Sequence, residues 1–283
     1  MKRRAIISSL GALAFSAGAA LLAARLAQQR GARRVDGSRI VSLSPALTET
    51  VLVLGGQQQL IGVSDFCKLP PQLSLPRLGS SLTPNYEAIT TLGPSLILCD
   101  DSAGAKRAEL AALAPCEALP WLTLAEVVQS TRRIGELLGR SQAGSELAEQ
   151  LEKRLSRRPA PDAPRVLLLL SYDPDRPAEL WFIRQNSLHG AALNAAGARN
   201  AIERDVPGLP RLSVEQLLAT DPDVVLIMPP PGSPPERGAE LVSAFAKLAP
   251  LRAVKNGRVA SIQASQSVGP SILLLVDAIE AKL

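Results

Sequence analysis

Two stretches that align without a gap decide the fold: Glu87-Ala-Ile-Thr-Thr-Leu-Gly-Pro94-Ser-Leu-Ile-Leu98 and Glu215-Gln-Leu-Leu-Ala-Thr-Asp-Pro222-Asp-Val-Val-Leu226. Each stretch predicts a short helix that ends before a proline and is followed by a buried strand. That order is frequent in α/β proteins, but a glutamate at the same place in both helices favours an internal repeat. We therefore expect two similar α/β lobes.

The paired glutamates have two explanations. An acidic residue near a helix N-terminus interacts favourably with the helix dipole, which is sufficient for each glutamate taken alone. One glutamate at an equivalent position on each lobe would also place two anchor points on one face of the molecule. We therefore predict that Glu87 and Glu215 dock onto a partner with two-fold symmetry.

The remainder of the chain alternates short apolar runs with helix-like stretches, which is typical of an α/β fold. Strands are expected at residues 39–43, 60–63 and 95–99, and then at 165–170, 179–183, 223–228 and 258–262. Between the two sets, residues 123–158 carry apolar side chains at mostly helical spacing. We expect one long connecting helix at 123–158 between an N-terminal lobe (35–122) and a C-terminal lobe (159–283). Gly135, Gly139 and Gly144 leave open a kink or two shorter helices.

The basic residues are concentrated at the start of the chain. Residues 1–34 hold seven of the 31 Lys and Arg residues and none of the 26 Asp and Glu residues, so the rest carries a net charge of −2. The net positive charge of the chain is therefore weak evidence for a nucleic-acid-binding surface.

The same basic residues flank an uncharged run at 5–24, which is typical of an export signal and also reaches the length of a membrane span. Residues 1–34 are thus expected to be a signal or an N-terminal membrane anchor. Cleavage or retention of this segment, and export by the Sec or the twin-arginine route, all remain open. In each case the positive residues before the run predict a body on the periplasmic or extracytoplasmic side of the inner membrane.

Residues that usually carry chemistry are few. The one histidine, His189, cannot form the multi-histidine cage of a zinc or manganese receptor, and most catalytic schemes lose their usual base. Cys67, Cys99 and Cys116 have no CxxC spacing, so we expect packing roles and at most one disulfide among them. The sequence also has no GxSxG, Walker or HExxH motif. It predicts neither an enzyme nor a bound metal ion.

Five motifs resemble, in their order and spacing, the periplasmic substrate-binding proteins of the ABC importers for cobalamin, iron-siderophores and haem. These motifs are Arg39-Ile-Val-Ser-Leu-Ser-Pro-Ala-Leu-Thr-Glu49, Gly62-Val-Ser-Asp-Phe-Cys-Lys-Leu-Pro70, Tyr86-Glu-Ala-Ile-Thr-Thr-Leu-Gly-Pro94, Ser213-Val-Glu-Gln-Leu-Leu-Ala-Thr-Asp-Pro222 and Val254-Lys-Asn-Gly-Arg-Val259. The resemblance covers residues 39–283. It implies a helical-backbone metal receptor, in which one rigid helix joins two lobes and the ligand cleft lies between them. It also implies that Glu87 and Glu215 form salt bridges with arginines of two permease subunits.

Members of this family hold their cargo with residues at the C-terminal ends of strands. By position, the candidate cleft residues are Ser44, Pro45, Phe66, Tyr86, Asp100, Tyr172, Trp181 and Gln266. Aromatic residues make up only 3% of the chain, so a large aromatic cage is excluded.

The resemblance implies a receptor, expected to be monomeric, that has no cofactor of its own. It would capture cobalamin or a related metal chelate, such as a corrinoid, and deliver it to a permease dimer with its ATPase subunits. An iron-siderophore or haem receptor of the same family remains open. So does a membrane-anchored sensory or scaffold module with this fold, held through residues 5–24.

Overall fold

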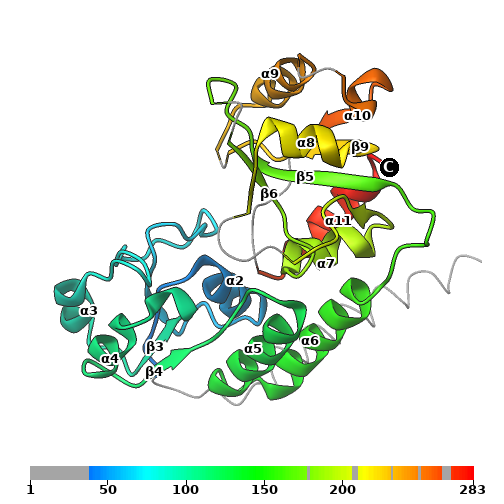
Figure 1. The fold of residues 1–283 in the computed structure, drawn as a ribbon. Helices are drawn as coiled ribbons and strands as arrows, with labels where there is room; N and C mark the ends of the chain where they lie inside the picture. The colour runs from blue at the N-terminus through cyan, green and yellow to red at the C-terminus, as the bar shows by residue number, and fades with distance from the viewer. Residues whose placement is uncertain (1–37, 177–178, 206–209, 231, 248–249, 263–268) are drawn as a thin grey trace, which may run out of the picture. The chain divides into compact units, whose positions relative to one another are not determined.

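The computed structural model describes residues 38–176, 179–205, 210–230, 232–247, 250–262 and 269–283 (Figure 1). Residues 38–283 form one compact unit. The predicted leader at 1–34 and the candidate residue Gln266 lie outside the described residues. Among the helices that are described, none has the length and apolar character to cross a membrane.

The N-terminal lobe is built on four parallel strands in the order β2-β1-β3-β4. In chain order these are β1 (Ile40–Ser42), β2 (Leu60–Val63), β3 (Leu96–Cys99) and β4 (Cys116–Ala118). Successive side chains of a strand point to opposite faces of the sheet. One face packs against α2 (Pro45–Val53), and the other against α3 (Tyr86–Leu92) and α4 (Lys106–Ala111). The predicted α/β lobe is confirmed.

The C-terminal lobe contains a mixed sheet in the order β10-β9-β5-β6-β8. Its strands are β5 (Arg165–Ser171), β6 (Leu180–Phe182), β7 (Arg199–Asn200), β8 (Arg211–Leu212), β9 (Val224–Ile227) and β10 (Val259–Ser261). The central strand β5 is parallel to β9 and β7 and antiparallel to β6. All four strands expected from the sequence in this lobe are present.

Helices cover both faces of this second sheet, in the alternation expected from a buried parallel core. Val166 and Leu168 of β5 face α7 and α11, whereas Leu167 and Leu169 face α8 and α9. The helices are α7 (Leu188–Ala195), α8 (Val214–Thr220), α9 (Glu236–Phe245), α10 (Arg252–Lys255) and α11 (Ile272–Glu280).

The prediction of one long helix at 123–158 is wrong. The segment forms two antiparallel helices, α5 (Leu124–Leu137) and α6 (Ser141–Leu155), which lie side by side in Figure 1. Gly139 lies between them with φ of 68°, a left-handed conformation that glycine adopts without strain. A Cβ on Gly135 would lie 2.7 Å from the Cα of Gly144, so these two glycines allow the helices to approach closely. The glycines therefore end one helix and pack it against the next.

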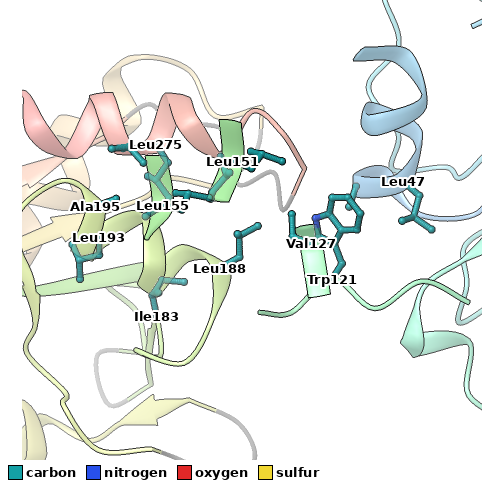
Figure 2. Packing of buried hydrophobic residues seen from close by; sticks show 14 of the residues in the cluster. Leu47, Trp121, Val127, Leu151, Leu155, Ile183, Leu188, Leu193, Ala195 and Leu275 are labelled. Carbon is teal, nitrogen blue, oxygen red and sulfur yellow. The ribbon is translucent and has the colours of Figure 1, made fainter. Parts of the chain in front are cut away.

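The helical hairpin α5–α6 joins the cores of the two lobes. Val127 of α5 and Leu151 of α6 are fully buried in one apolar cluster that also includes Leu47 of α2, Leu188 of α7 and Leu275 of α11. Figure 2 shows Trp121 and Val127 between Leu47 and Leu188. The predicted lobe boundaries at 122/123 and 158/159 are not tested by this arrangement and stay a prediction.

Candidate functional site

The repeat seen in the sequence is also a repeat of structure. Glu87 is the second residue of α3, and Glu215 is the second residue of α8. Both helices end at a residue in the left-handed conformation, Gly93 with φ of 55° and Asp221 with φ of 39°, and each is followed by a strand. Asp221 is the only non-glycine residue with positive φ in the described part of the chain. The helix and following strand of one lobe thus match those of the other lobe, from the first turn of the helix to its last.

Matching contacts at the start of each helix direct the two glutamates outward. The side chain of Asn85 accepts a hydrogen bond of 3.0 Å from the Ala88 amide, and Ser213 accepts one of 3.2 Å from the Gln216 amide. The inner face of each helix is anchored by one fully buried residue, Ile89 or Leu217. Glu87 and Glu215 are exposed as a result. The hydroxyl of Ser213 lowers the pKa of Glu215 by a hydrogen bond to its carboxylate, so this side chain is charged at neutral pH.

An arginine fixes the end of each repeated helix. The guanidinium of Arg39 donates hydrogen bonds of 2.5 Å to the Leu92 carbonyl and 3.1 Å to the Gly93 carbonyl. At the equivalent position, Arg165 donates a hydrogen bond of 2.9 Å to the Thr220 carbonyl. A cation at a helix C-terminus satisfies carbonyls that lack partners and complements the helix dipole. Both repeated helices are therefore tied to the first strand of their own lobe.

The backbone amide of each arginine also makes an equivalent hydrogen bond in both lobes. The Arg39 amide donates a hydrogen bond of 2.8 Å to the Ser95 hydroxyl, and the Arg165 amide donates one of 2.9 Å to the Asp223 carboxylate. Sequence reasoning missed this pair of arginines. The signal was present, since an arginine precedes or begins the first apolar run of both lobes.

A shallow hollow lies beside each repeated helix. The hollow next to α3 has a volume of about 350 Å³, and the hollow next to α8 has a volume of about 370 Å³. The first includes Glu87, Asn85 and Thr91 in its lining, and the second includes Gln216, Ala219 and Thr220. A similar charged helix with a hollow at its side is thus present on each lobe.

A second group of candidate residues lies in the loops that follow the strands of the N-terminal sheet. Buried hydroxyl groups lie beneath these loops and connect them. Ser42, Ser44, Thr48, Ser64 and Ser81 are all almost completely buried. The Thr48 hydroxyl donates a hydrogen bond of 2.8 Å to Ser42 Oγ, and the Ser64 amide donates one of 2.8 Å to the Ser42 carbonyl. Ser81 Oγ donates a hydrogen bond of 3.2 Å to the Leu43 carbonyl. These contacts hold together the loops that follow β1 and β2.

Exposed side chains project from these same loops. Pro45 is exposed at the start of α2, and Phe66 after β2 is 72% exposed. Leu82, which sequence reasoning missed, is 63% exposed next to Ser81. The Asp100 amide donates a hydrogen bond of 3.3 Å to Ser81 Oγ, so the loop after β3 joins the same network. The structure therefore connects the loops of Ser44, Pro45, Phe66 and Asp100.

The other predicted cleft residues have partners of their own. The Tyr86 hydroxyl donates a hydrogen bond to Glu109, which raises the pKa of Tyr86 to about 12. Tyr172 is buried, and its ring packs edge-to-face on Phe245 at a centroid distance of 5.3 Å. Trp181 lies in β6 with the guanidinium of Arg211 5.4 Å from its ring centroid. The described contacts do not connect these three residues with the Ser81 network.

Two α/β lobes, each with a similar acidic helix at an equivalent position, are the architecture of a two-lobed binding protein. The chain belongs to the periplasmic binding protein family, which it matches over residues 40–265.

Two curated relatives are named for the same class of ligand. The chain is 29% identical over 206 residues to the cobalamin-binding protein of Halobacterium salinarum, and the alignment covers 68% of this chain. It covers 54% of that relative, so the chain spans about half of the relative's length. Identity to the vitamin B12-binding protein of Vibrio cholerae is 27% over 208 residues, with 69% of this chain and 71% of that protein covered.

Solved structures resemble this fold closely. The periplasmic vitamin B12 binding protein of Vibrio cholerae has a TM-score of 0.67 at 26% identity, with 87% of this chain and 96% of that chain covered. A periplasmic haem binding protein from Pseudomonas aeruginosa has a TM-score of 0.69 at 27% identity, with 86% and 91% covered.

Proposed function

We propose that this chain is the extracytoplasmic substrate-binding protein of an ABC importer, and that it carries cobalamin or a related corrinoid. The observation that carries this proposal is the exposed glutamate at the second position of both α3 and α8. Two equivalent acids on two similar lobes suit a permease made of two similar subunits. Membership in a family of binding proteins supports binding without catalysis.

The nature of the cargo follows from the side chains that can ligate a metal. Haem iron is usually held by His, Tyr, Cys or Met. Among the described residues, His189, Tyr172, Met228, Cys67 and Cys99 are buried. The Tyr86 hydroxyl is bound to Glu109, and the sulfur of Cys116 lies 3.4 Å from that of Cys99. A chelate whose metal keeps its own ligands therefore suits this chain better than a haem that takes a ligand from the protein.

The loops of the first lobe provide a surface for such a chelate. Pro45, Phe66 and Leu82 offer exposed apolar contacts above a base of buried hydroxyls. A corrinoid has a large, partly apolar ring with amide side chains at its rim, so apolar area combined with hydrogen-bonding groups matches its chemistry. We propose these loops as the contact of the N-terminal lobe with the cargo.

A titration of the full chain tests the cargo. Cyanocobalamin, haemin and a ferric siderophore are added separately, and binding is read from tryptophan fluorescence and from ligand absorbance that co-elutes with the protein. Stoichiometric binding of cyanocobalamin is expected. Binding of haemin or siderophore alone would replace the corrinoid by that ligand, and no binding to any of the three would overturn the cargo proposal.

Charge reversal tests docking independently of the cargo. The double variant Glu87→Arg with Glu215→Arg is expected to abolish uptake by cells that contain the importer, while the affinity for the cargo in solution stays unchanged. Glu149→Arg is the matched control, because Glu149 is an exposed glutamate of α6 that lies outside both repeated helices. Normal uptake by the double variant would refute the docking role.

A further inference from the structure

Two of the three cysteines meet at the end of the first sheet. Cys99 is the last residue of β3, and Cys116 is the first residue of the neighbouring strand β4. Their sulfur atoms are 3.4 Å apart. In the register of the two strands, Ile97 lies opposite Cys116 and Cys99 lies opposite Ala118, so the cysteines are diagonal neighbours on one face. Both side chains belong to the cluster that α3 and α4 cover.

The third cysteine is separated from this pair by the sheet itself. Cys67 belongs to the cluster on the opposite face, together with Ile40 and Leu98. It is buried, and its thiol donates a hydrogen bond of 3.1 Å to Thr48 Oγ1. The fold therefore selects one pair among the three that the sequence allows.

We propose that Cys99 and Cys116 form a disulfide whenever the folded protein meets a disulfide oxidant, and that this bond is present in the exported protein. The second half of the proposal rests on the extracytoplasmic location proposed above, because disulfides persist in oxidising compartments such as the periplasm. The bond would fix the end of β3 immediately before Asp100, the residue that ties the following loop to the Ser81 network.

The two thiols are suited to different steps of the reaction. Cys116 is partly exposed, and the hydrogen bond from Cys99 together with the charge of Arg107 lowers the pKa of its thiol. Cys99 is buried, and its hydrogen bond to Cys116 together with burial raises the pKa of its thiol. Cys116 is therefore the thiolate that meets the oxidant first.

Atoms and electrons balance by thiol–disulfide exchange. The Cys116 thiolate attacks one sulfur of an external disulfide RSSR, which forms a mixed disulfide and releases one RS⁻. The Cys99 thiol then loses its proton and attacks the Cys116 sulfur, which closes the Cys99–Cys116 bond and releases the second RS⁻. The two protons of the cysteine thiols end on the two released thiolates, so one RSSR is reduced to two RSH.

The bond requires a small movement that the sheet permits. A disulfide is about 2.05 Å long, so the sulfurs must approach by more than an ångström. Within the described part of the chain, β4 is the edge strand of this sheet and its one neighbour is β3, so it can shift without breaking a second ladder.

Thiol counting on the full chain tests the proposal. The exported protein is quenched in acid, unfolded and alkylated with iodoacetamide without reductant, and the modified residues are identified by mass spectrometry. One alkylated cysteine, Cys67, and a peptide pair linked through Cys99 and Cys116 are expected, with three alkylated cysteines after reduction. In a second arm, the reduced folded protein is incubated with oxidised glutathione, and the same linked peptides are expected.

The two arms test the disulfide pairing and the presence of the bond in the cell separately. Linked peptides in the glutathione arm with three free thiols in the protein isolated from its cells would support the pairing and overturn the second half of the proposal, the presence of the bond in the cell. Three free thiols in both arms would overturn the disulfide, and so would a link that involves Cys67. The Cys67→Ala variant should retain the linked peptides, whereas Cys116→Ala should lose them.

Discussion

The carboxylate of Glu49 on α2 accepts a hydrogen bond of 2.5 Å from the backbone amide of Ser271, immediately before α11, and a second of 3.2 Å from the Ser271 hydroxyl. The two residues are 222 positions apart in the chain, and they connect the first lobe with the last helix of the second. A Cβ on Gly269 would lie 2.6 Å from the Glu49 carboxylate, so glycine provides the space for this contact. A carboxylate near a helix N-terminus is also favoured by the helix dipole.

We expect Glu49→Ala to lower the free energy of unfolding by about 1–3 kcal/mol, because the partly buried Ser271 amide loses this carboxylate acceptor. Urea unfolding followed by circular dichroism measures the change. Ser271→Ala removes only the longer hydrogen bond and should cost about 1 kcal/mol or less. An effect of Glu49→Ala no larger than that of Ser271→Ala would show that the amide contact contributes little.

The hairpin α5–α6 makes Gly135 a test of the fold. Alanine is favoured over glycine by about 1 kcal/mol inside a helix, so Gly135→Ala would stabilise one continuous helix. In the hairpin the new Cβ would lie 2.7 Å from the Cα of Gly144, and we expect a loss of about 1–3 kcal/mol from overpacking. Thermal and urea unfolding measure the sign of the change in the free energy of unfolding. Ala143→Gly, at an exposed neighbour in α6, is the matched control for helix propensity, and a rise in stability for Gly135→Ala would contradict the hairpin.

The repeat and the two sheets could be predicted from the sequence because their signals are local. A capping residue before each helix, a proline after it and a run of apolar residues in the strand all lie within one short stretch. The same local signals gave one long helix at 123–158, because helical spacing continues on both sides of Gly139. The left-handed conformation of Gly139 and the close approach of Gly135 and Gly144 distinguish two packed helices from one.

The candidate site was predicted less completely, since burial depends on contacts between distant residues. Tyr172 follows strand β5, where a cleft residue was expected, but Phe245 from α9 packs on its ring. Phe66 follows strand β2 and is exposed as expected of a contact residue. No short-range pattern separates these two aromatics. Ligand contact for Phe66, for Tyr172 and for the other candidate cleft residues stays a prediction.

Arg165→Ala is expected to loosen α8. The guanidinium gives up its hydrogen bonds to the Thr220 and Ala201 carbonyls, and a charged donor of this kind contributes about 1.5–3 kcal/mol. Faster amide exchange in α8, with little change in α3, would be the signature in hydrogen exchange followed by mass spectrometry. The equivalent variant Arg39→Ala should give the reverse pattern. Equal exchange in both helices for both variants would contradict the local role of the two arginines.

Phe66→Ala separates ligand contact from stability. Because the ring is 72% exposed, its removal should change the free energy of unfolding by no more than about 0.5 kcal/mol. If the ring packs on the cargo, the dissociation constant for cyanocobalamin should rise about tenfold, which equals about 1.4 kcal/mol. Val53→Ala is the control, because Val53 is an exposed apolar residue at the C-terminal end of α2. An unchanged dissociation constant would remove Phe66 from the cargo surface.

His189 predicts a dependence of stability on pH. It is buried on α7, and burial lowers the pKa of its imidazole from 6.5 to about 4. Above pH 6.5 the imidazole is neutral in the folded and unfolded states, so it adds no pH dependence there. As the pH falls from 6.5 to about 4, the unfolded chain takes up a proton that the folded protein does not bind. Stability is therefore lost across this range, on the order of 3 kcal/mol in total.

Urea unfolding at pH 7 and at pH 5 measures this effect against His189→Leu, which removes the titrating group and keeps an apolar side chain of similar size. The native protein should lose more stability between the two pH values than the variant, by about 1–2 kcal/mol. The lowered pKa of Asp223 belongs to a carboxylate that titrates below this range, so it contributes little to the difference. An equal loss in both proteins would show that His189 takes up its proton in the folded state as readily as in the unfolded chain.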